Sequence, residues 1–264
     1  MSAVVIDGGL VHYEAFGRGQ PVLFLHGWLG SWRYWMPTME SISDKYRAYA
    51  LDLWGFGDTD KSKPRYEIPD YVGLINNFLN NMGITEAPII GHALGAAVAI
   101  EHAARFPDRT KKVMAVSLPM NPGAITRKLN DMVNRSVMSR MLYWRQMHRD
   151  VQQEADKTAD GVVDRSIHSF SQIDMQSRLE MIAQSSDSML LLVHGERDDL
   201  INPVSHNLLN GTWSNIHRIG LTESKHFPML EETAKFYRLL QDFLDVQGEL
   251  SRLQLKEEWR RRTR

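Results

Sequence analysis

The stretch APIIGHALGAAVAIEHAARFP, residues 87–107, decides the fold. A short apolar run leads into GHALG at residues 91–95, and a segment rich in helix-forming residues follows at once. Glycines are needed at both ends of such a turn, because side chains there would clash with the strand or the helix. The stretch therefore predicts a buried strand, a sharp turn with Ala93 at its apex, and a helix over residues 94–105.

Apolar runs rich in β-forming residues recur on both sides of this stretch. They cover residues 3–6, 10–15, 21–27, 46–51, 88–90, 112–117 and 189–193. The first two runs flank Asp7-Gly8-Gly9, a turn sequence typical of a β-hairpin. Helical patterns at residues 71–82, 94–105 and 232–246 separate most of the later runs. This alternation predicts an α/β fold with a mostly parallel central sheet flanked by helices.

Residues 120–186 interrupt the alternation, because they are polar, rich in Met and Arg, and lack a strand-like run. We expect a helical cap here, inserted between two core segments at residues 1–119 and 187–246. Adaptable methionines and aromatic residues could line an apolar site or simply pack the cap, and packing is the favoured use. These residues are Met132, Met138, Met141, Tyr143, Trp144, Met147, Phe170, Met175 and Met181.

Residues 247–264 form a charged C-terminal extension. Leu250, Leu253 and Trp259 recur there at helical spacings, and the segment ends in basic residues. Such a segment could dock on a partner or a membrane surface, but we expect a frayed, solvated helix.

Composition excludes several classes of function. Lys and Arg number 31 and Asp and Glu number 32, so the net charge of −1 gives no field that would favour nucleic acid. The absence of cysteine excludes disulfides, thiolate metal sites and a cysteine nucleophile. No signal-peptide pattern or transmembrane-length apolar stretch is present, which favours a cytoplasmic protein. No cluster has metal-ligand spacing, and no cofactor is expected. The oligomeric state stays open.

Four further motifs lie in a fixed order around the GHALG turn. They are HGWLGS at residues 26–31, LDLWGFGDTD at residues 51–60, LLLVHGERDDLI at residues 190–201 and SKHFPMLEE at residues 224–232. Together with GHALG they resemble the α/β-hydrolase superfamily over about residues 3 to 245. The predicted cap matches the family poorly.

The resemblance implies the positions of a catalytic triad in the order nucleophile, acid, histidine. It puts Ala93 at the nucleophile position, where the family pattern G-x-S-x-G has serine. It assigns the acid to Asp198, in preference to its neighbour Asp199, and the base to His226. The chain thus departs from the family at the one residue that forms the covalent bond.

The resemblance also implies an oxyanion hole, a pair of backbone N–H groups that stabilise negative charge on a carbonyl oxygen. The two donors would be the N–H groups of Trp28 and Leu94. Ser31 lies on the same loop as Trp28, but the sequence gives no reason to place it at the apex of the turn. Four other histidines are expected to be structural: His26, His92, His102 and His194.

Ala93 has no atom that can attack a carbonyl, and loss of the serine costs on the order of 10⁶ in kcat in a related triad system. Three interpretations remain. The favoured one is an ester or acyl hydrolase by lineage that is inactive or strongly impaired in covalent hydrolysis because of Ala93. Its partner would be an apolar small-molecule ligand or ester substrate. The second is a ligand-binding protein without catalysis. The third is an enzyme that uses His226 and Asp198 as a general base without a covalent step, in the manner of lyase-like or oxygenase relatives.

Overall fold

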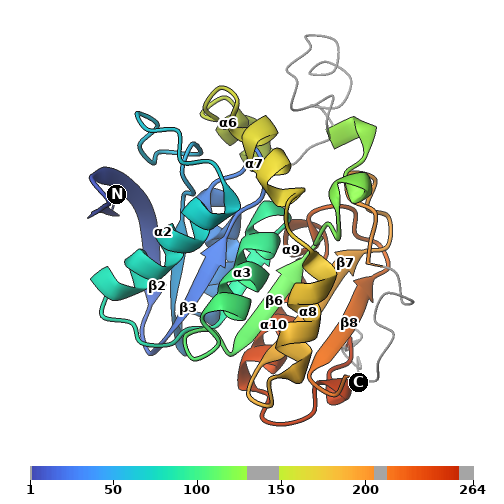
Figure 1. Cartoon of the computed structure of the whole chain (residues 1–264). Coiled ribbons are helices and arrows are strands. Elements are labelled where there is room, and N and C mark those ends of the chain that lie inside the picture. The colour runs from blue at the N-terminus through green and yellow to red at the C-terminus, as the bar shows by residue number, and fades with distance from the viewer. Residues whose placement is uncertain (1, 130–148, 205–212, 256–264) are drawn as a thin grey trace, which may run out of the picture.

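The computed structural model describes residues 2–129, 149–204 and 213–255. Its strands form one sheet in the order β1-β2-β4-β3-β5-β6-β7-β8 (Figure 1). β2 is antiparallel to β1 and β4, whereas every other neighbouring pair is parallel. The strands are β1 (Ser2–Ile6), β2 (Gly9–Gly17), β3 (Gln20–Leu25), β4 (Tyr46–Leu51), β5 (Ile89–His92), β6 (Lys112–Val116), β7 (Met189–Gly195) and β8 (Ile216–Leu221). The predicted α/β fold with a mostly parallel sheet is confirmed.

Helices cover both faces of the sheet. Figure 1 shows α2, α3 and α8 in front of it and α10 behind it. The α-helices of the described residues are α1 (Met36–Ile42), α2 (Ile68–Asn81), α3 (Leu94–Arg105), α6 (Arg149–Ala155), α7 (Val162–Phe170), α8 (Met175–Gln184), α9 (Pro228–Glu231) and α10 (Thr233–Asp245). Short 3₁₀ turns are η1 (Trp32–Trp35), η2 (Pro122–Ala124) and η5 (Leu250–Arg252). Within the described ranges, no helix has the length and apolar content needed to cross a bilayer.

The hydrophobic core consists of two layers, one on each face of the sheet. Successive side chains of a strand point to opposite faces. In β3, Leu23 and Leu25 therefore pack with α2 and α3, whereas Val22 and Phe24 pack with α1 and α10. Because both faces are covered, β3 is apolar along its buried length, as its unbroken apolar run predicts.

The N-terminal hairpin and α3 lie where the sequence predicts them. Asp7 and Gly8 both have positive φ, 48° and 73°, the conformation that a tight turn between β1 and β2 requires. The sequence pattern missed β8, because His217 and Arg218 interrupt its apolar run. This strand is the outer edge of the sheet, and edge strands need not be continuously apolar.

Among the described residues between β6 and β7, in the segment predicted as a cap, lie the helices α6, α7 and α8. α7 contacts the loops at the carboxyl edge of the strands. The N–H of Ala159, just before α7, donates to the Gly55 carbonyl, and the Ile68 N–H donates to the Ser169 hydroxyl oxygen. α8 instead packs along α3, and its Arg178 pairs with the fully buried carboxylate of Glu101 at 2.6 Å. α8 therefore belongs to the helical layer that flanks the sheet.

Some predicted cap residues can be followed in the structure. Phe170 and Met175 are buried and pack with the core, whereas Met181 is 45% exposed. Their positions agree with packing as the main use of apolar side chains in this segment. The others, from Met132 to Met147, lie outside the described residues.

The start of the C-terminal extension differs from the predicted solvated helix. Leu250 and Leu253 are buried with the core layer that contains α10, and η5 forms a short turn beside β8. The prediction of a solvated helix is wrong here, because burial of the two leucines outweighs the polar character of their neighbours. Trp259 lies outside the described residues.

Substitution by alanine distinguishes Gly95, which is tightly packed after β5, from Gly73, an ordinary helical glycine. A Cβ on Gly95 would lie 2.5 Å from the carbonyl oxygen of Leu25, whereas a Cβ on Gly73 in α2 would meet no atom within 4 Å. We expect Gly95→Ala to lower the free energy of unfolding by about 1–3 kcal/mol through overpacking. Gly73→Ala should raise it by about 0.5–1 kcal/mol. Urea unfolding followed by circular dichroism measures both, and equal effects would contradict the close packing at residue 95.

Candidate active site

The turn between β5 and α3 has the strained geometry of a nucleophile elbow. Ala93 has φ 48° and ψ −108°, a conformation that residues with a side chain rarely adopt. Its N–H donates to the Val116 carbonyl at 2.9 Å, which fixes the turn to β6. Such strain costs on the order of 1–3 kcal/mol and is concentrated at functional sites.

Strained residues gather around this turn. In the described part of the chain, the residues other than glycine with positive φ are Asp7, Leu29, Ala93 and Ser117. Asp7 belongs to the distant hairpin. Leu29 follows the predicted oxyanion donor, and the Ser117 hydroxyl donates to the His226 carbonyl at 3.1 Å. Three of the four strained residues therefore surround the predicted site.

The structure brings the predicted acid and base together. His226 Nδ1 lies 2.9 Å from Asp198 Oδ2, and both side chains are buried, with 6% and 2% exposed. The other carboxylate oxygen, Oδ1, accepts the N–H groups of Leu200 at 2.9 Å and Ile201 at 3.0 Å. Asp199 points elsewhere and pairs with Lys128. The geometry thus couples His226 to Asp198, the residue that the motif spacing indicated.

His226 and two backbone N–H groups set the charge state of Asp198. Burial alone would raise the pKa of this carboxyl, but the neighbouring His226 and the two backbone N–H groups outweigh burial and lower the pKa. Asp198 is therefore ionised at neutral pH. An ionised carboxylate at Nδ1 holds the ring with its Nδ1–H toward Asp198, which leaves Nε2 as the nitrogen available to accept a proton.

The loop that carries Trp28 packs against the elbow. A Cβ on Gly27 would lie 3.0 Å from the Ala93 Cβ, so the backbone before Trp28 runs directly beside the turn. Leu94 is the first residue of α3, and N–H groups in the first turn of a helix have no partner inside the helix. The Trp28 indole N–H also donates to Ser166 Oγ of α7 at 2.9 Å. The inserted segment therefore contacts the same residue whose backbone is the predicted donor.

Two other polar residues near the site, His26 and Ser31, hydrogen-bond to the surrounding backbone. The N–H of Leu53 donates to His26 Nε2 at 3.0 Å, and His26 Nδ1 bonds the Gly27 carbonyl. Ser31 is fully buried, and its hydroxyl oxygen accepts the Arg33 N–H at the start of η1. This bond makes Ser31 the N-cap of η1.

Three further histidines, His102, His194 and His92, each contact a neighbouring side chain. His102 is fully buried and bonds Thr110 at 3.0 Å, and His194 lies 2.8 Å from an Arg218 nitrogen. His92 differs from both, because its ring centroid lies 4.6 Å from that of His226. The sequence identified the elbow but gave no sign of this contact.

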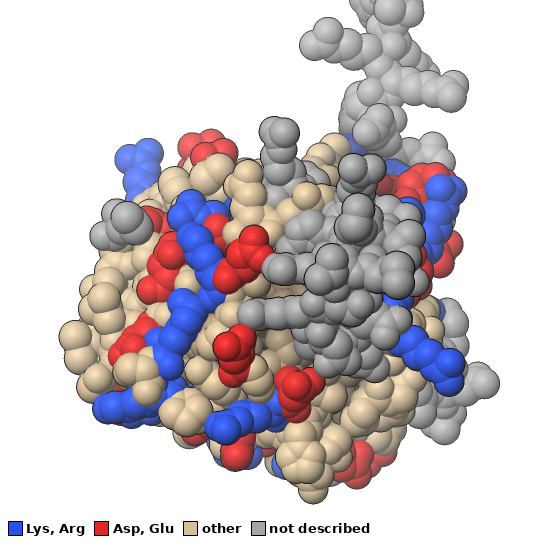
Figure 2. All heavy atoms as spheres, turned by 90° about the horizontal axis from the view of Figure 1, so that it is seen from above, with Lys and Arg blue, Asp and Glu red and all other residues tan. Residues whose placement is uncertain are grey.

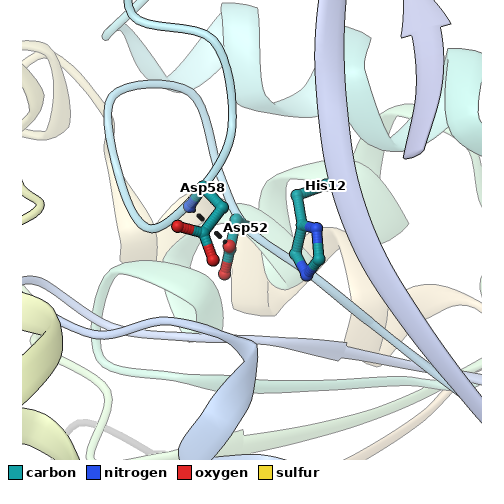
Figure 3. Close-up of side chains that lie close together, drawn as sticks. All are labelled: His12, Asp52 and Asp58. Carbon is teal, nitrogen blue, oxygen red and sulfur yellow. Dashed lines mark hydrogen bonds between the residues drawn. The ribbon is translucent and has the colours of Figure 1, made fainter. Parts of the chain in front are cut away.

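Among the residues that the structure describes, one cluster of His and Asp side chains has the spacing of a metal site. His12, Asp52 and Asp58 each offer a ligand atom, and these atoms lie within 4.8 Å of one another (Figure 3). The sequence missed the cluster, because β2 supplies His12 from far upstream. Asp52 already accepts a backbone N–H from Asp58, and the two Asp58 oxygens lie 3.0 Å from Lys157 and 3.4 Å from Arg33. These cations neutralise Asp58, so we assign the cluster to the scaffold.

The chain is similar in sequence to known proteins of one fold family. A family model described as the alpha/beta hydrolase fold matches residues 20–249. A 2-hydroxy-6-oxo-2,4-heptadienoate hydrolase of Pseudomonas putida is 26% identical over 266 residues, covering 91% of this chain and 95% of that protein. Epoxide hydrolase 4 of Homo sapiens is 33% identical over 125 residues, which are 46% of this chain and 34% of that protein. The chain likewise spans only 30% of an acetyltransferase component from Cupriavidus necator and 42% of an epoxide hydrolase from Corynebacterium.

Solved structures extend the similarity to nearly the whole chain. A serine-to-alanine variant of a meta-cleavage product hydrolase from Pseudomonas fluorescens is 25% identical, with a TM-score of 0.72 over 92% of this chain and 97% of that one. An enol-lactonase from Burkholderia xenovorans has a TM-score of 0.78 at 17% identity, covering 92% and 99% of the two chains, and shows the shared fold. With the family model matching most of its length, the chain belongs to the alpha/beta hydrolase fold family.

Proposed function

We propose that this protein is a hydrolase that acts on a small apolar ester or related carbonyl compound without a covalent enzyme intermediate. The observation that carries the proposal is the buried 2.9 Å contact between His226 Nδ1 and Asp198 Oδ2 beside an elbow with alanine at its apex. The acid and base of a triad are present, and the attacking hydroxyl is not. A base without a nucleophile can still activate water.

The proposed reaction uses water in place of the serine hydroxyl. His226 Nε2 removes a proton from water, and the water oxygen forms a bond with the substrate carbonyl carbon. The carbonyl π electrons move to its oxygen, where the N–H groups of Trp28 and Leu94 stabilise the negative charge. When the intermediate collapses, the bond to the leaving alkoxide breaks, and the imidazolium returns its proton to that oxygen. The products are a carboxylic acid and an alcohol.

Asp198 stabilises the positive charge that His226 gains during this reaction. The carboxylate lies against Nδ1, so it keeps the ring in the tautomer with Nε2 free to accept a proton. Both side chains are almost fully buried, and the attraction between the carboxylate and the imidazolium is stronger there than in water. The pair is therefore suited to a general base.

The substrate class follows from the inserted segment and from one relative. The sequence of the inserted segment is rich in Met and includes Tyr143 and Trp144, side chains suited to an apolar ligand. Positive and negative side chains are interspersed on the face shown in Figure 2, which gives that face no uniform field for a polyanion. The name of the Pseudomonas putida relative includes a 6-oxo group. We therefore include ketones beside esters among candidate substrates. For a ketone, the bond that breaks joins the carbonyl carbon to a neighbouring carbon, and that leaving carbon takes the proton from the His226 imidazolium.

The role of residue 93 can be tested by restoring a hydroxyl. We expect Ala93→Ser to react with a fluorophosphonate probe and to hydrolyse short aryl esters at least about 10²-fold faster, because loss of a serine nucleophile costs on the order of 10⁶ in a related system. The unchanged chain should not react with the probe. Intact-protein mass spectrometry measures the modification, and absorbance of the released phenol measures hydrolysis.

The double variant Ala93→Ser, His226→Ala is the control, because it has the hydroxyl without its base and should lose the reaction with the probe. A folded Ala93→Ser protein that neither reacts with the probe nor hydrolyses esters faster would contradict the proposed alignment of base and oxyanion donors. Circular dichroism establishes that the variant is folded.

The non-covalent reaction predicts that His226 matters even when residue 93 is alanine. General acid–base catalysis contributes about 10²–10⁴-fold, so His226→Ala should lower the kcat/KM of the unchanged chain by at least about 10²-fold. Asp198→Asn should act in the same direction. Asp199→Asn is the matched control and should leave kcat/KM unchanged, because Asp199 pairs with Lys128 away from His226. Ester and ketone panels followed by chromatography measure turnover. Turnover that is insensitive to His226→Ala would rule out the general-base role.

A further inference from the structure

Tyr34 and His92 form a buried chain of hydrogen bonds beneath the proposed site. The Gly27 N–H donates to the Tyr34 hydroxyl oxygen at 2.5 Å, and that hydroxyl lies 3.1 Å from His92 Nδ1. On its other side, His92 Nε2 lies 2.9 Å from the carbonyl oxygen of His226. The chain joins the loop before Trp28, the elbow and the loop of the proposed base.

The two ends of this chain fix the direction of every bond in it. The His226 carbonyl can only accept, so His92 Nε2 must carry a proton and donate. In a neutral ring Nδ1 is then an acceptor, and the Tyr34 hydroxyl must donate to it. The same hydroxyl oxygen accepts from the Gly27 N–H, which can only donate. A single tautomer of His92 therefore satisfies all the groups.

Burial makes these bonds hard to replace. His92 is 1% exposed and Tyr34 is 2% exposed, so water has little access to either side chain. Burial lowers the pKa of His92 well below its usual value, and the nearby His226 lowers it further. His92 is therefore neutral at physiological pH. An unmade bond in such a site leaves a buried donor or acceptor unsatisfied, which is costly.

Aromatic packing holds the same groups from the side. The Tyr34 and His92 rings meet edge to face, with centroids 5.6 Å apart and an interplanar angle of 88°. The ring centroid of Phe227, the residue after the proposed base, lies 5.9 Å from that of Tyr34 and 5.0 Å from that of His92. The loop of His226 is thus held through its carbonyl and through its neighbouring side chain.

We propose that Tyr34 and His92 are positioning residues that align the His226 imidazole with the oxyanion loop. The inference rests on the proposed role of His226 as the base. The residues act through backbone groups: His92 holds the carbonyl of His226, and Tyr34 holds the N–H of Gly27, next to Trp28. Neither side chain needs to touch the substrate. Residue 93 carries no hydroxyl that could bond Nε2, so these contacts, Asp198 and the Ser117 hydroxyl fix the base.

The alignment of His226 with the oxyanion loop can be measured as the rate at which Ala93→Ser reacts with a fluorophosphonate probe. Tyr34 and His92 are therefore substituted in this background. Because a misplacement of about 1 Å can cost on the order of 10²-fold, we expect Tyr34→Phe and His92→Leu each to slow the reaction at least about tenfold. His92→Gln should recover much of the loss, because its amide nitrogen can donate to the same carbonyl. Tyr71→Phe is the matched control. Tyr71 is a buried tyrosine whose hydroxyl bonds the Trp54 carbonyl at 3.3 Å, and its loss should leave the rate unchanged.

Nuclear magnetic resonance of the unchanged chain gives a readout that does not depend on activity. Imidazole ¹⁵N shifts should show His92 protonated at Nε2 and bare at Nδ1, and the Nδ1–H signal of His226 should shift in Tyr34→Phe but not in Tyr71→Phe. An Nδ1–H tautomer of His92, or equal rates for Tyr34→Phe and its parent, would overturn the proposal. If Ala93→Ser does not react with the probe at all, the proposed hydrolysis fails, and the tautomer and the His226 shift still decide the positioning role.

Discussion

The close approach of the start of α3 to the end of β3 is the constraint on which the site depends. A Cβ on Gly95 would lie 2.5 Å from the Leu25 carbonyl oxygen and 2.7 Å from that of His26, so only glycine allows this packing. The approach forces the backbone through the strained conformation at Ala93 and brings the first N–H of α3 toward the loop that follows β3. The geometry of the elbow thus comes from packing of the backbone, and it persists when the side chain at the apex is a methyl group.

The sequence predicted the features that depend on local backbone demands. The elbow needs glycines on both sides of residue 93, and a parallel sheet covered on both faces needs unbroken apolar strands such as β3. Both requirements leave a pattern in neighbouring residues. The pairing of His226 with Asp198 is a contact between distant segments, and it was reached only because motif order in a known family supplied what local patterns lack.

The features that the sequence missed depend on contacts between distant segments. Tyr34 and His92 are 58 residues apart, and no periodicity links a tyrosine in a 3₁₀ turn to a histidine at the end of a strand. β8 was missed because an edge strand tolerates polar residues, and the buried position of Leu250 depends on α10 and β8 being in place. Helical patterning likewise could not show that α8 packs along α3. In each case tertiary packing outweighs a weak local signal.

The proposed base is fixed by groups that do not include residue 93. Its Nδ1 bonds Asp198, and its carbonyl oxygen accepts from both His92 and Ser117, so the ring and the backbone of His226 have separate anchors. An alanine at the apex therefore removes the nucleophile without releasing the base. In a triad whose serine hydroxyl helps to hold the histidine, replacing the serine removes the nucleophile and also loosens the base. Here the backbone anchors separate them, which is why a chain with alanine at the elbow can keep a buried, oriented imidazole and an ionised partner carboxylate.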